Sequence, residues 1–317
     1  MSKKKILIIK HPNFKESWKQ EILSLFKQAK FLFINDDKDL IIKNVKNYNA
    51  MIGCPRYIFE QENFSYFKEL EWIHAGGAGI ENYMKSTLKK SKIILTNGKI
   101  IQGPEVADHA IALLLYFTRN IHEIVINNKV HTRPIEIFEK NALVIGLGGI
   151  GFCIAERLRS FGATIDALTN EMPTISQCLS NVYYSIKNIT LNKYDFILNA
   201  APLTYKTQSL IDYNFFKKMK KNSIFINVSR GKLLKTNDLL KNSIYKKFRG
   251  IALDVTEPEP LNDGHPLYSA NNVLITPHIA GLSDKNRNRG FNLIKLNIQR
   301  YLNNEDLLNI VDKKKEY

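Results

Sequence analysis

Cysteine, tryptophan and long hydrophobic runs are scarce in this chain of 317 residues. The three cysteines, Cys54, Cys153 and Cys178, are odd in number and lack the spacing of metal ligands. We therefore expect no disulfide framework, no bound metal and a reducing, cytoplasmic setting. The longest apolar stretch, residues 111–117, is far too short to span a bilayer. The basic N-terminus has few apolar positions and fits a first buried strand better than a signal peptide.

Acidic residues are also few, since 30 Asp and Glu stand against 46 Lys and Arg and the formal net charge is +16. Such a charge is compatible with binding to nucleic acid or an anionic surface, or with a field that concentrates acidic substrates. The lysines are spread from Lys3 to Lys315, however, with brief clusters at 3–5, 217–221 and 313–315. No nucleic-acid-binding motif accompanies them. We interpret the charge as scattered over solvated faces and expect neither a nucleic-acid nor a membrane partner.

What the chain does contain is a repeated alternation of short apolar runs with amphipathic stretches. This pattern is typical of parallel sheets covered by helices, and the length suits two α/β domains. A first series of strands is predicted at residues 5–10, 31–35, 50–54, 70–77 and 92–97. A second series is predicted at residues 142–146, 163–168, 195–200, 223–228, 250–255 and 272–277.

Two long helices are predicted outside these alternations. Residues 104–126 open with proline at a suitable first helical position and are apolar on more than one face. We expect this helix to be buried against another domain or subunit. The second helix is predicted over residues 283–301 and is followed by a polar tail.

A glycine-rich turn follows the first strand of the second series and precedes a helix. Its glycines stand in the G-x-G-x-x-G spacing, in which the first permits a tight turn, the second admits a pyrophosphate and the third lets helix pack on strand. The pyrophosphate would lie at the helix N-terminus, where free N–H groups favour anions. The residues predicted to bind a dinucleotide here are Gly146, Leu147, Gly148, Gly149, Ile150 and Gly151.

The end of the next strand bears on the choice between NAD and NADP. An acidic residue there would bind the ribose hydroxyls and repel a 2′-phosphate. Thr169 and Asn170 occupy this end, with no acid and no arginine. Asp166 lies three residues earlier, within the strand, and is expected to be structural. The sequence therefore predicts that NADPH and NADH are both accepted, with a slight preference for NADPH.

Three later segments each end an apolar run with a turn that carries a charged or titratable side chain, namely Arg230, Glu259 or His278. A parallel sheet presents catalytic groups in this way, at the carboxyl ends of its strands. A guanidinium can grip a carboxylate with two hydrogen bonds, and a carboxylate can hold an imidazole as the acid that protonates a carbonyl oxygen. This is the chemistry of 2-keto acid reduction. The segments are NVSRGKLL (227–234), LDVTEPEPL (253–261) and TPHIAGLS (276–283).

These segments and the glycine turn resemble those of the D-isomer-specific 2-hydroxyacid dehydrogenases over about residues 74–283. The resemblance implies an α/β fold in which a Rossmann-type dinucleotide-binding domain, residues 99–284, is inserted in a flavodoxin-like substrate domain, residues 1–98 and 285–317. It also implies an oxidoreductase that reduces a small 2-keto acid with NAD(P)H, with glyoxylate or hydroxypyruvate as the first choice. A homodimer formed through the helix at 104–126 is expected on the same ground.

The resemblance further assigns roles to individual residues. Arg230 binds the substrate carboxylate and the reacting carbonyl oxygen, and His278 donates the proton. Glu259 is chosen over Glu257 as the partner of His278, because the family's acid lies five residues after the aspartate of its LDV motif. The turn HAGGAGIEN (74–82) offers backbone N–H groups to the carboxylate, at the positions of Ala78 and Gly79.

The same resemblance places other residues beside the cofactor. Asp254 is expected to hydrogen-bond the nicotinamide carboxamide, although a helix-capping or turn role is the alternative. His109 is not among them, because it lies in VADHA at a helix start and is expected to pack at a domain or subunit boundary. The remaining residues expected to line the cofactor are Ala201, Pro202, Val228, Ser229 and His278.

Two other functions stay open at this stage. Transcriptional corepressors of the same fold keep the triad and sense a dinucleotide without physiological turnover. They carry long extra tails for partners, which disfavours them because this chain ends at Tyr317. A basic nucleic-acid-binding module is the third option.

Overall fold

The computed structural model describes residues 3–59, 67–84, 86–171 and 178–317. The chain divides into two compact units, which we call the first unit (Met1–Ile101 with Asp284–Tyr317) and the second unit (Gln102–Ser283). Residues 99–101 belong to the first unit because its C-terminal segment holds them. Asn309 Nδ2 donates to the Lys99 carbonyl at 2.6 Å, and Arg289 Nε donates to the Ile101 carbonyl at 2.9 Å.

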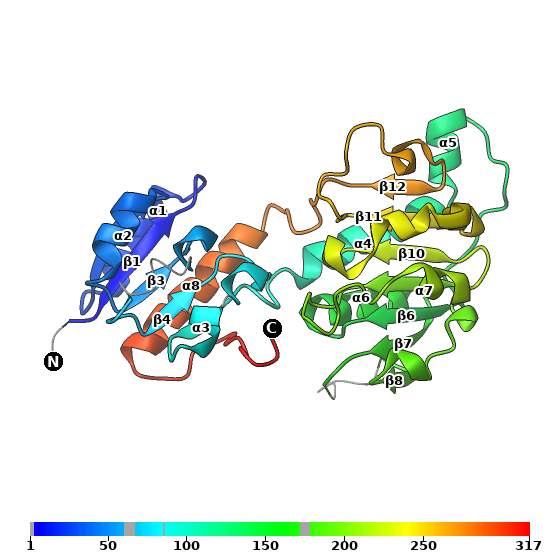
Figure 1. Ribbon diagram of the computed structural model, residues 1–317. Coiled ribbons are helices and arrows are strands. Elements are labelled where there is room, and N and C mark those ends of the chain that lie inside the picture. The colour runs from blue at the N-terminus through cyan, green and yellow to red at the C-terminus, as the bar shows by residue number, and fades with distance from the viewer. Residues whose placement is uncertain (1–2, 60–66, 85, 172–177) are drawn as a thin grey trace. The chain divides into compact units, whose positions relative to one another are not determined.

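The first unit is a five-stranded sheet with helices on both faces (Figure 1). Its strands are β1 (Lys5–Lys10), β2 (Lys30–Asn35), β3 (Ala50–Ile52), β4 (Trp72–His74) and β5 (Ile94–Thr96). Its helices are α1 (Glu16–Leu25), α2 (Lys38–Val45), α3 (Ser86–Lys90) and α8 (Asn286–Leu302), with short 3-10 helices η1 (Arg56–Phe59) and η3 (Glu81–Tyr83). The strands are all parallel, in the order β2-β1-β3-β4-β5, which is the flavodoxin-like order.

Successive side chains of β1 point to opposite faces of the sheet, and both faces are covered, which explains why this strand is a continuous apolar run. Ile6 and Ile8 pack with residues of α1 and α8 on one face of the sheet, whereas Leu7 and Ile9 pack with residues of α2 on the other. A strand that is buried on both faces has no polar positions to alternate with. The same rule applies to the other central strands.

The segment after α8 is more than a polar tail, because it closes the open edge of β5. Leu307 and Val311 are buried, and the Val311 amide donates to the Leu95 carbonyl at 2.8 Å. Asn297 of α8 holds the segment by a pair of hydrogen bonds to the Leu308 backbone, at 3.1 and 2.7 Å. An edge strand leaves backbone groups unpaired, and this segment satisfies some of them.

The second unit contains a seven-stranded parallel sheet. Its strands are β6 (Asn141–Ile145), β7 (Thr164–Leu168), β8 (Asn181–Tyr183), β9 (Phe196–Asn199), β10 (Ile224–Asn227), β11 (Gly250–Leu253) and β12 (Val273–Ile275). Its helices are α4 (Gly103–Thr118), α5 (Ile121–Asn127), α6 (Gly149–Ser160) and α7 (Tyr213–Lys218). Its 3-10 helices are η4 (Ile186–Asn188), η5 (Leu191–Lys193), η6 (Gly231–Leu233), η7 (Thr236–Leu239), η8 (Lys241–Lys247) and η9 (Pro266–Ser269).

The strand order β12-β11-β10-β9-β6-β7-β8 is the doubly wound Rossmann order with one further strand, β12. From β6 the chain runs outward to β7 and β8 on one side and then returns to β9 on the other side, so the strand order reverses next to β6. In such sheets ligands bind outside the carboxyl ends of the strands at this reversal. The predicted fold class, an α/β protein with flavodoxin-like and Rossmann-type sheets, is confirmed.

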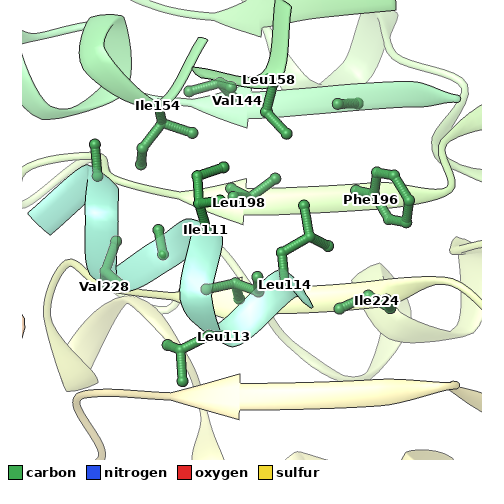
Figure 2. Close-up of a cluster of buried hydrophobic side chains, with 14 of the residues drawn as sticks. Ile111, Leu113, Leu114, Val144, Ile154, Leu158, Phe196, Leu198, Ile224 and Val228 are labelled. Carbon is green, nitrogen blue, oxygen red and sulfur yellow. The ribbon is translucent and has the colours of Figure 1, made fainter. Parts of the chain in front are cut away.

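Helix α4 lies across one face of this sheet and contributes Ile111, Leu113 and Leu114 to the core beneath it (Figure 2). Val144 and Leu198 of the central strands point toward the same core. Each fully buried aliphatic side chain of this size contributes on the order of 2 kcal/mol to stability. The core therefore fixes the central strands, whose carboxyl ends lead into the loops described below.

The prediction of one helix over residues 104–126 is wrong, because α4 and α5 are separate. Asn120 lies between them in the left-handed conformation, with a φ of 59°, and it is fully buried. Its side chain donates to Thr132 and accepts from Arg249, so tertiary contacts hold this break. Neither α4 nor another helix in the described part of the chain is long and apolar enough to cross a membrane.

Candidate active site

The glycine turn after β6 has the space that a dinucleotide requires. Gly146 has a φ of +86°, and a Cβ there would overlap the backbone of Ala201. A Cβ on Gly151 would overlap the carbonyl of Gly146, so this glycine lets α6 approach the strand. A Cβ on Gly148 would meet nothing within 4 Å, which leaves the middle of the turn open to a ligand. These three environments correspond to the three roles of the glycines in a dinucleotide fingerprint.

The turn leads directly into the N-terminus of α6. Gly148 is the residue before the helix, and no side chain caps its first amides. Leu147 precedes this position, and Gly149 and Ile150 form the first helical positions. Uncapped N–H groups and the helix dipole attract an anion. The cradle therefore fits the pyrophosphate of a nicotinamide dinucleotide.

Thr169 and Asn170 follow β7 directly beside the glycine turn. The Gly146 amide donates to the Leu168 carbonyl at 2.8 Å, and the Thr169 amide donates to the Tyr183 carbonyl of β8 at 3.0 Å. No acidic side chain stands at this strand end between Leu168 and Asn170.

Asp166 lies three residues earlier, within β7, and its side chain is hydrogen-bonded inside the protein. Its buried carboxylate accepts hydrogen bonds from Lys193 at 2.7 Å, Tyr194 at 2.7 Å and Asn181 at 2.9 Å. Burial raises the pKa of Asp166, but these hydrogen bonds outweigh burial and hold the pKa below its ordinary value. Asp166 therefore joins β7 to its neighbours, and its carboxylate is occupied by contacts within the protein.

Two buried asparagines shape the turn that carries Arg230. Asn199 at the end of β9 donates to Asn227 Oδ1 at 3.0 Å, and the same oxygen accepts from the Ser229 amide at 3.2 Å. Asn227 Nδ2 donates to the Arg230 carbonyl at 3.3 Å. Ser229 also donates its hydroxyl to the Ala201 carbonyl. The backbone of residues 228–230, together with the Ala201–Pro202 loop, is thus held at the carboxyl edge of the sheet.

The loop of Arg230 packs directly on the loop of Glu259. A Cβ on Gly231 would overlap the carbonyl of Thr256, so only glycine permits this approach. Thr256 in turn donates its amide to Glu259 Oε2 at 3.3 Å and its hydroxyl to the Pro258 carbonyl at 2.7 Å. The guanidinium of Arg230 is half-buried and donates to the Ser229 carbonyl at 2.7 Å.

Glu259 and His278 meet across two loops that follow different strands. His278 Nδ1 lies 2.6 Å from Glu259 Oε1, and both side chains remain accessible, at 47% and 39% exposure. A carboxylate oxygen can only accept, so Nδ1 carries the proton and Nε2 is left for a substrate. The pair sits at the carboxyl edge of β11 and β12, in the same unit as the glycine cradle.

His278 has a left-handed backbone conformation, with a φ of 54°. This conformation is uncommon for residues other than glycine and persists where surrounding contacts enforce it. Asp254 supplies these contacts. Its carbonyl accepts from the His278 amide at 2.9 Å, and its carboxylate accepts from the amides of Ile279 at 3.0 Å and Ala280 at 3.1 Å.

His109 also belongs to this site, although no local pattern in the sequence indicates it. Thr276 donates its hydroxyl to Asp254 Oδ1 at 2.6 Å, so its oxygen must accept from His109 Nε2, 3.1 Å away. His109 Nε2 also lies 3.4 Å from Asp254 Oδ1. Burial raises the pKa of Asp254, but hydrogen bonds from His109, Thr276 and the two amides outweigh burial and hold the pKa below its ordinary value. These contacts of His109 lie within the second unit, and its packing at a domain or subunit boundary stays a prediction.

Ala78 and Gly79 lie in the first unit, in the turn after β4. The amides of these two residues donate to no acceptor within the described part of the chain. The side of Gly76 and Gly77 where a Cβ would stand is open, with nothing within 4 Å. Free adjacent amides in an uncrowded turn can bind an anion.

Comparison with known proteins identifies the family. The sequence model described as D-isomer specific 2-hydroxyacid dehydrogenase, NAD binding domain, matches residues 111–280. Human glyoxylate reductase/hydroxypyruvate reductase is 31% identical over 230 residues, which cover 69% of this chain and 70% of the human protein. The glyoxylate reductase of Thermofilum pendens is 28% identical over 300 residues, which cover 89% of this chain and 88% of that protein.

Solved structures share the whole fold. The D-isomer specific 2-hydroxyacid dehydrogenase from Xanthobacter autotrophicus Py2, in complex with NADPH and MES, aligns with a TM-score of 0.84 and 20% identity over 100% of each chain. The family model covers more than half of this chain, and the human relative is 31% identical over two thirds of it. The protein therefore belongs to the D-isomer specific 2-hydroxyacid dehydrogenases, which are NAD(P)-dependent oxidoreductases.

Proposed function

We propose that this dehydrogenase reduces a short 2-keto acid, glyoxylate or hydroxypyruvate, to the 2-hydroxy acid. The observation that carries the proposal is the 2.6 Å pairing of His278 Nδ1 with Glu259 at the carboxyl edge of the dinucleotide-binding unit. The names of the human and Thermofilum relatives support the choice of substrate. A bound reduced nicotinamide would supply the hydride.

His278 is the proton donor in this proposal. Glu259 accepts a hydrogen bond from Nδ1–H. This hydrogen bond directs Nε2 toward the substrate and stabilises the charged imidazolium. The Nε2 proton passes to the carbonyl oxygen as negative charge develops there. In the opposite direction the neutral ring accepts the hydroxyl proton at Nε2.

Arg230 holds the substrate from the second unit. Its fork of N–H groups can bind a carboxylate oxygen and the reacting carbonyl oxygen together, which orients one face of the keto acid. Ala78 and Gly79 of the first unit would supply two backbone amides for a substrate carboxylate. Small residues in their turn leave room for the approach.

The cradle of residues 146–151 would hold the dinucleotide, and the loops at 201–202 and 228–229 would line it. Thr169 and Asn170 present no carboxylate that would repel a 2′-phosphate, so NADPH is accepted and slightly preferred over NADH. Asp254, whose carboxylate accepts from Thr276 and from the amides of Ile279 and Ala280, would serve the site by holding the His278 turn. A hydrogen bond from Asp254 to the nicotinamide carboxamide stays a prediction.

The proposed assembly is a homodimer formed through α4 and α5. Exposed apolar side chains on α5 support it, with Ile121 at 42%, Ile124 at 47% and Val125 at 70% exposure. Sedimentation of the purified protein tests this assembly. The three free cysteines support a reducing, cytoplasmic setting.

A panel of 2-keto acids tests the function. Glyoxylate, hydroxypyruvate, pyruvate and a longer branched 2-keto acid are each supplied with NADPH or NADH, and cofactor absorbance is followed. We expect the highest kcat/KM for glyoxylate or hydroxypyruvate. A higher kcat/KM for the branched acid would contradict the proposed substrate class.

A further inference from the structure

The turn that carries Ala78 and Gly79 is pinned from one side by the segment that follows β5. The Gly98 amide donates to the Gly77 carbonyl at 2.9 Å. Asn97 Nδ2 donates to the Ala78 carbonyl at 2.6 Å. Two successive carbonyls of the turn are therefore anchored on the same neighbouring segment.

These anchors determine where the next two amides point. In a trans peptide the carbonyl of one residue and the N–H of the next point in opposite directions. The cis peptide bonds of the described chain lie elsewhere, at Glu257–Pro258 and Glu259–Pro260. Because the carbonyls of Gly77 and Ala78 face residues 97–98, the amides of Ala78 and Gly79 face away from that segment. The turn thus presents two adjacent donors on its free side.

The side-chain amide of Asn97 is held in one orientation, with its oxygen and its nitrogen each bound to a different partner. Asn97 is 2% exposed, and its Oδ1 accepts from the Lys99 amide at 3.3 Å, which leaves Nδ2 for Ala78. The backbone of Asn97 is paired with Asn309 of the C-terminal segment, at 3.2 Å and 3.3 Å. Asn309 also donates to the Lys99 carbonyl at 2.6 Å. The C-terminal segment therefore supports the residue that anchors the turn.

We propose that Asn97 is a positioning residue for substrate binding. It fixes the peptide planes at residues 77–79 before substrate arrives, so that the two free amides meet the carboxylate without rearrangement. The inference rests on the proposed function, because it needs the turn to bind a carboxylate. It adds a residue that touches neither the substrate nor the cofactor, and it gives the C-terminal segment a part in substrate affinity.

The test is Asn97→Leu, which removes the donor without adding charge. We expect KM for the keto acid to rise about tenfold while kcat stays within about twofold, because carboxylate binding acts on ground state and transition state alike. The affinity for oxalate, measured by calorimetry on the NADPH-bound protein, should fall by a similar factor. The affinity for NADPH should not change, since its cradle lies in the second unit.

Asn49→Leu is the matched control. Asn49 is half-buried in the same unit and accepts from the Lys5 amide at 3.0 Å, at the amino end of the sheet. This variant should keep the wild-type KM and oxalate affinity, even if it unfolds at a lower temperature. Equal changes in both variants would reduce Asn97 to a general structural role and overturn the inference.

Two failures can be told apart. A wild-type protein that turns over no 2-keto acid contradicts the proposed function, and oxalate calorimetry then still decides whether the turn binds a carboxylate. An active Asn97→Leu variant with unchanged KM and unchanged oxalate affinity contradicts the positioning role alone.

Discussion

His278 Nδ1 and Glu259 Oε1 lie 2.6 Å apart, although each residue follows a different strand of the second unit. The contact decides which nitrogen of the imidazole is available for chemistry. It depends on two supports, the amide of Thr256 on Glu259 and the carboxylate of Asp254 under the turn of His278. The contact between His278 and Glu259 therefore depends on loops that are held to one another as well as to the sheet.

Glu259→Gln keeps the shape of the side chain and removes its charge. We expect kcat/KM for reduction to fall about a hundredfold, because a neutral amide no longer stabilises the imidazolium of His278. Glu257→Gln is the control, since the structure pairs His278 with Glu259. Steady-state kinetics of both variants measure the difference, and a larger loss in the Glu257 variant would reassign the pair.

Arg230→Lys keeps the positive charge and removes the planar fork. We expect kcat/KM to fall at least about a hundredfold, on the order of 3 kcal/mol of transition-state stabilisation. NADPH affinity should stay near the wild-type value. Arg157→Lys is a matched control, because the Arg157 guanidinium joins α6 to Asp108 and Pro104 of α4. Near-normal turnover by the Arg230 variant would exclude it as the substrate clamp.

Thr169→Asp should shift the cofactor preference toward NADH. A carboxylate at this strand end would accept hydrogen bonds from the free ribose hydroxyls and repel a 2′-phosphate. The ratio of kcat/KM with NADPH to that with NADH measures the shift. Asp166→Asn should leave this ratio unchanged, because Asp166 is bound to Lys193 and Tyr194 within the protein. A shift in the Asp166 variant alone would mean that the ribose lies elsewhere.

His74 should make the first unit less stable in mild acid. Burial lowers the pKa of His74 to about 4, from an ordinary value of 6.5. The unfolded chain therefore binds the proton below pH 6.5, whereas the folded chain binds it only near pH 4. Stability from the neutral ring is complete above pH 6.5 and declines as the pH falls, by about 3 kcal/mol across this window.

Urea unfolding at pH 7 and pH 4.5 measures this decline. His74→Gln lacks the titrating ring but can still hydrogen-bond Thr96, which lies 2.8 Å from His74 Nδ1. The variant should lose less stability than the wild type between the two pH values. Parallel losses in the two proteins would show that His74 does not titrate in this way.

Much of the fold could be predicted because its signals are local. Strands such as β9 and β10 are buried on both faces and read as unbroken apolar runs. The glycine cradle and the three strand-end residues lie within segments of about nine residues. Strand β8 was missed because it has three residues, none of them buried, at the edge of the sheet.

The features that escaped prediction depend on contacts between distant segments. The break after α4 is enforced by Arg249 and Thr132 on Asn120, and nothing in the helical pattern around it signals these partners. His109 reaches Thr276 and Asp254 from a helix that reads as ordinary core. The spacing of apolar residues in a sequence predicts which face of a helix or strand is buried. It does not predict which side chains of other elements contact that face.

Transfer of a deuterium label from NADPH to the product tests the proposed reduction of a 2-keto acid. Purified protein is supplied with hydroxypyruvate and NADPH that is deuterated at both C4 positions of the nicotinamide, and the product is examined by mass spectrometry and chiral chromatography. We expect D-glycerate that carries one deuterium at C2. Unlabelled product, L-glycerate, or bound NADPH without any product from hydroxypyruvate or glyoxylate would contradict this proposal.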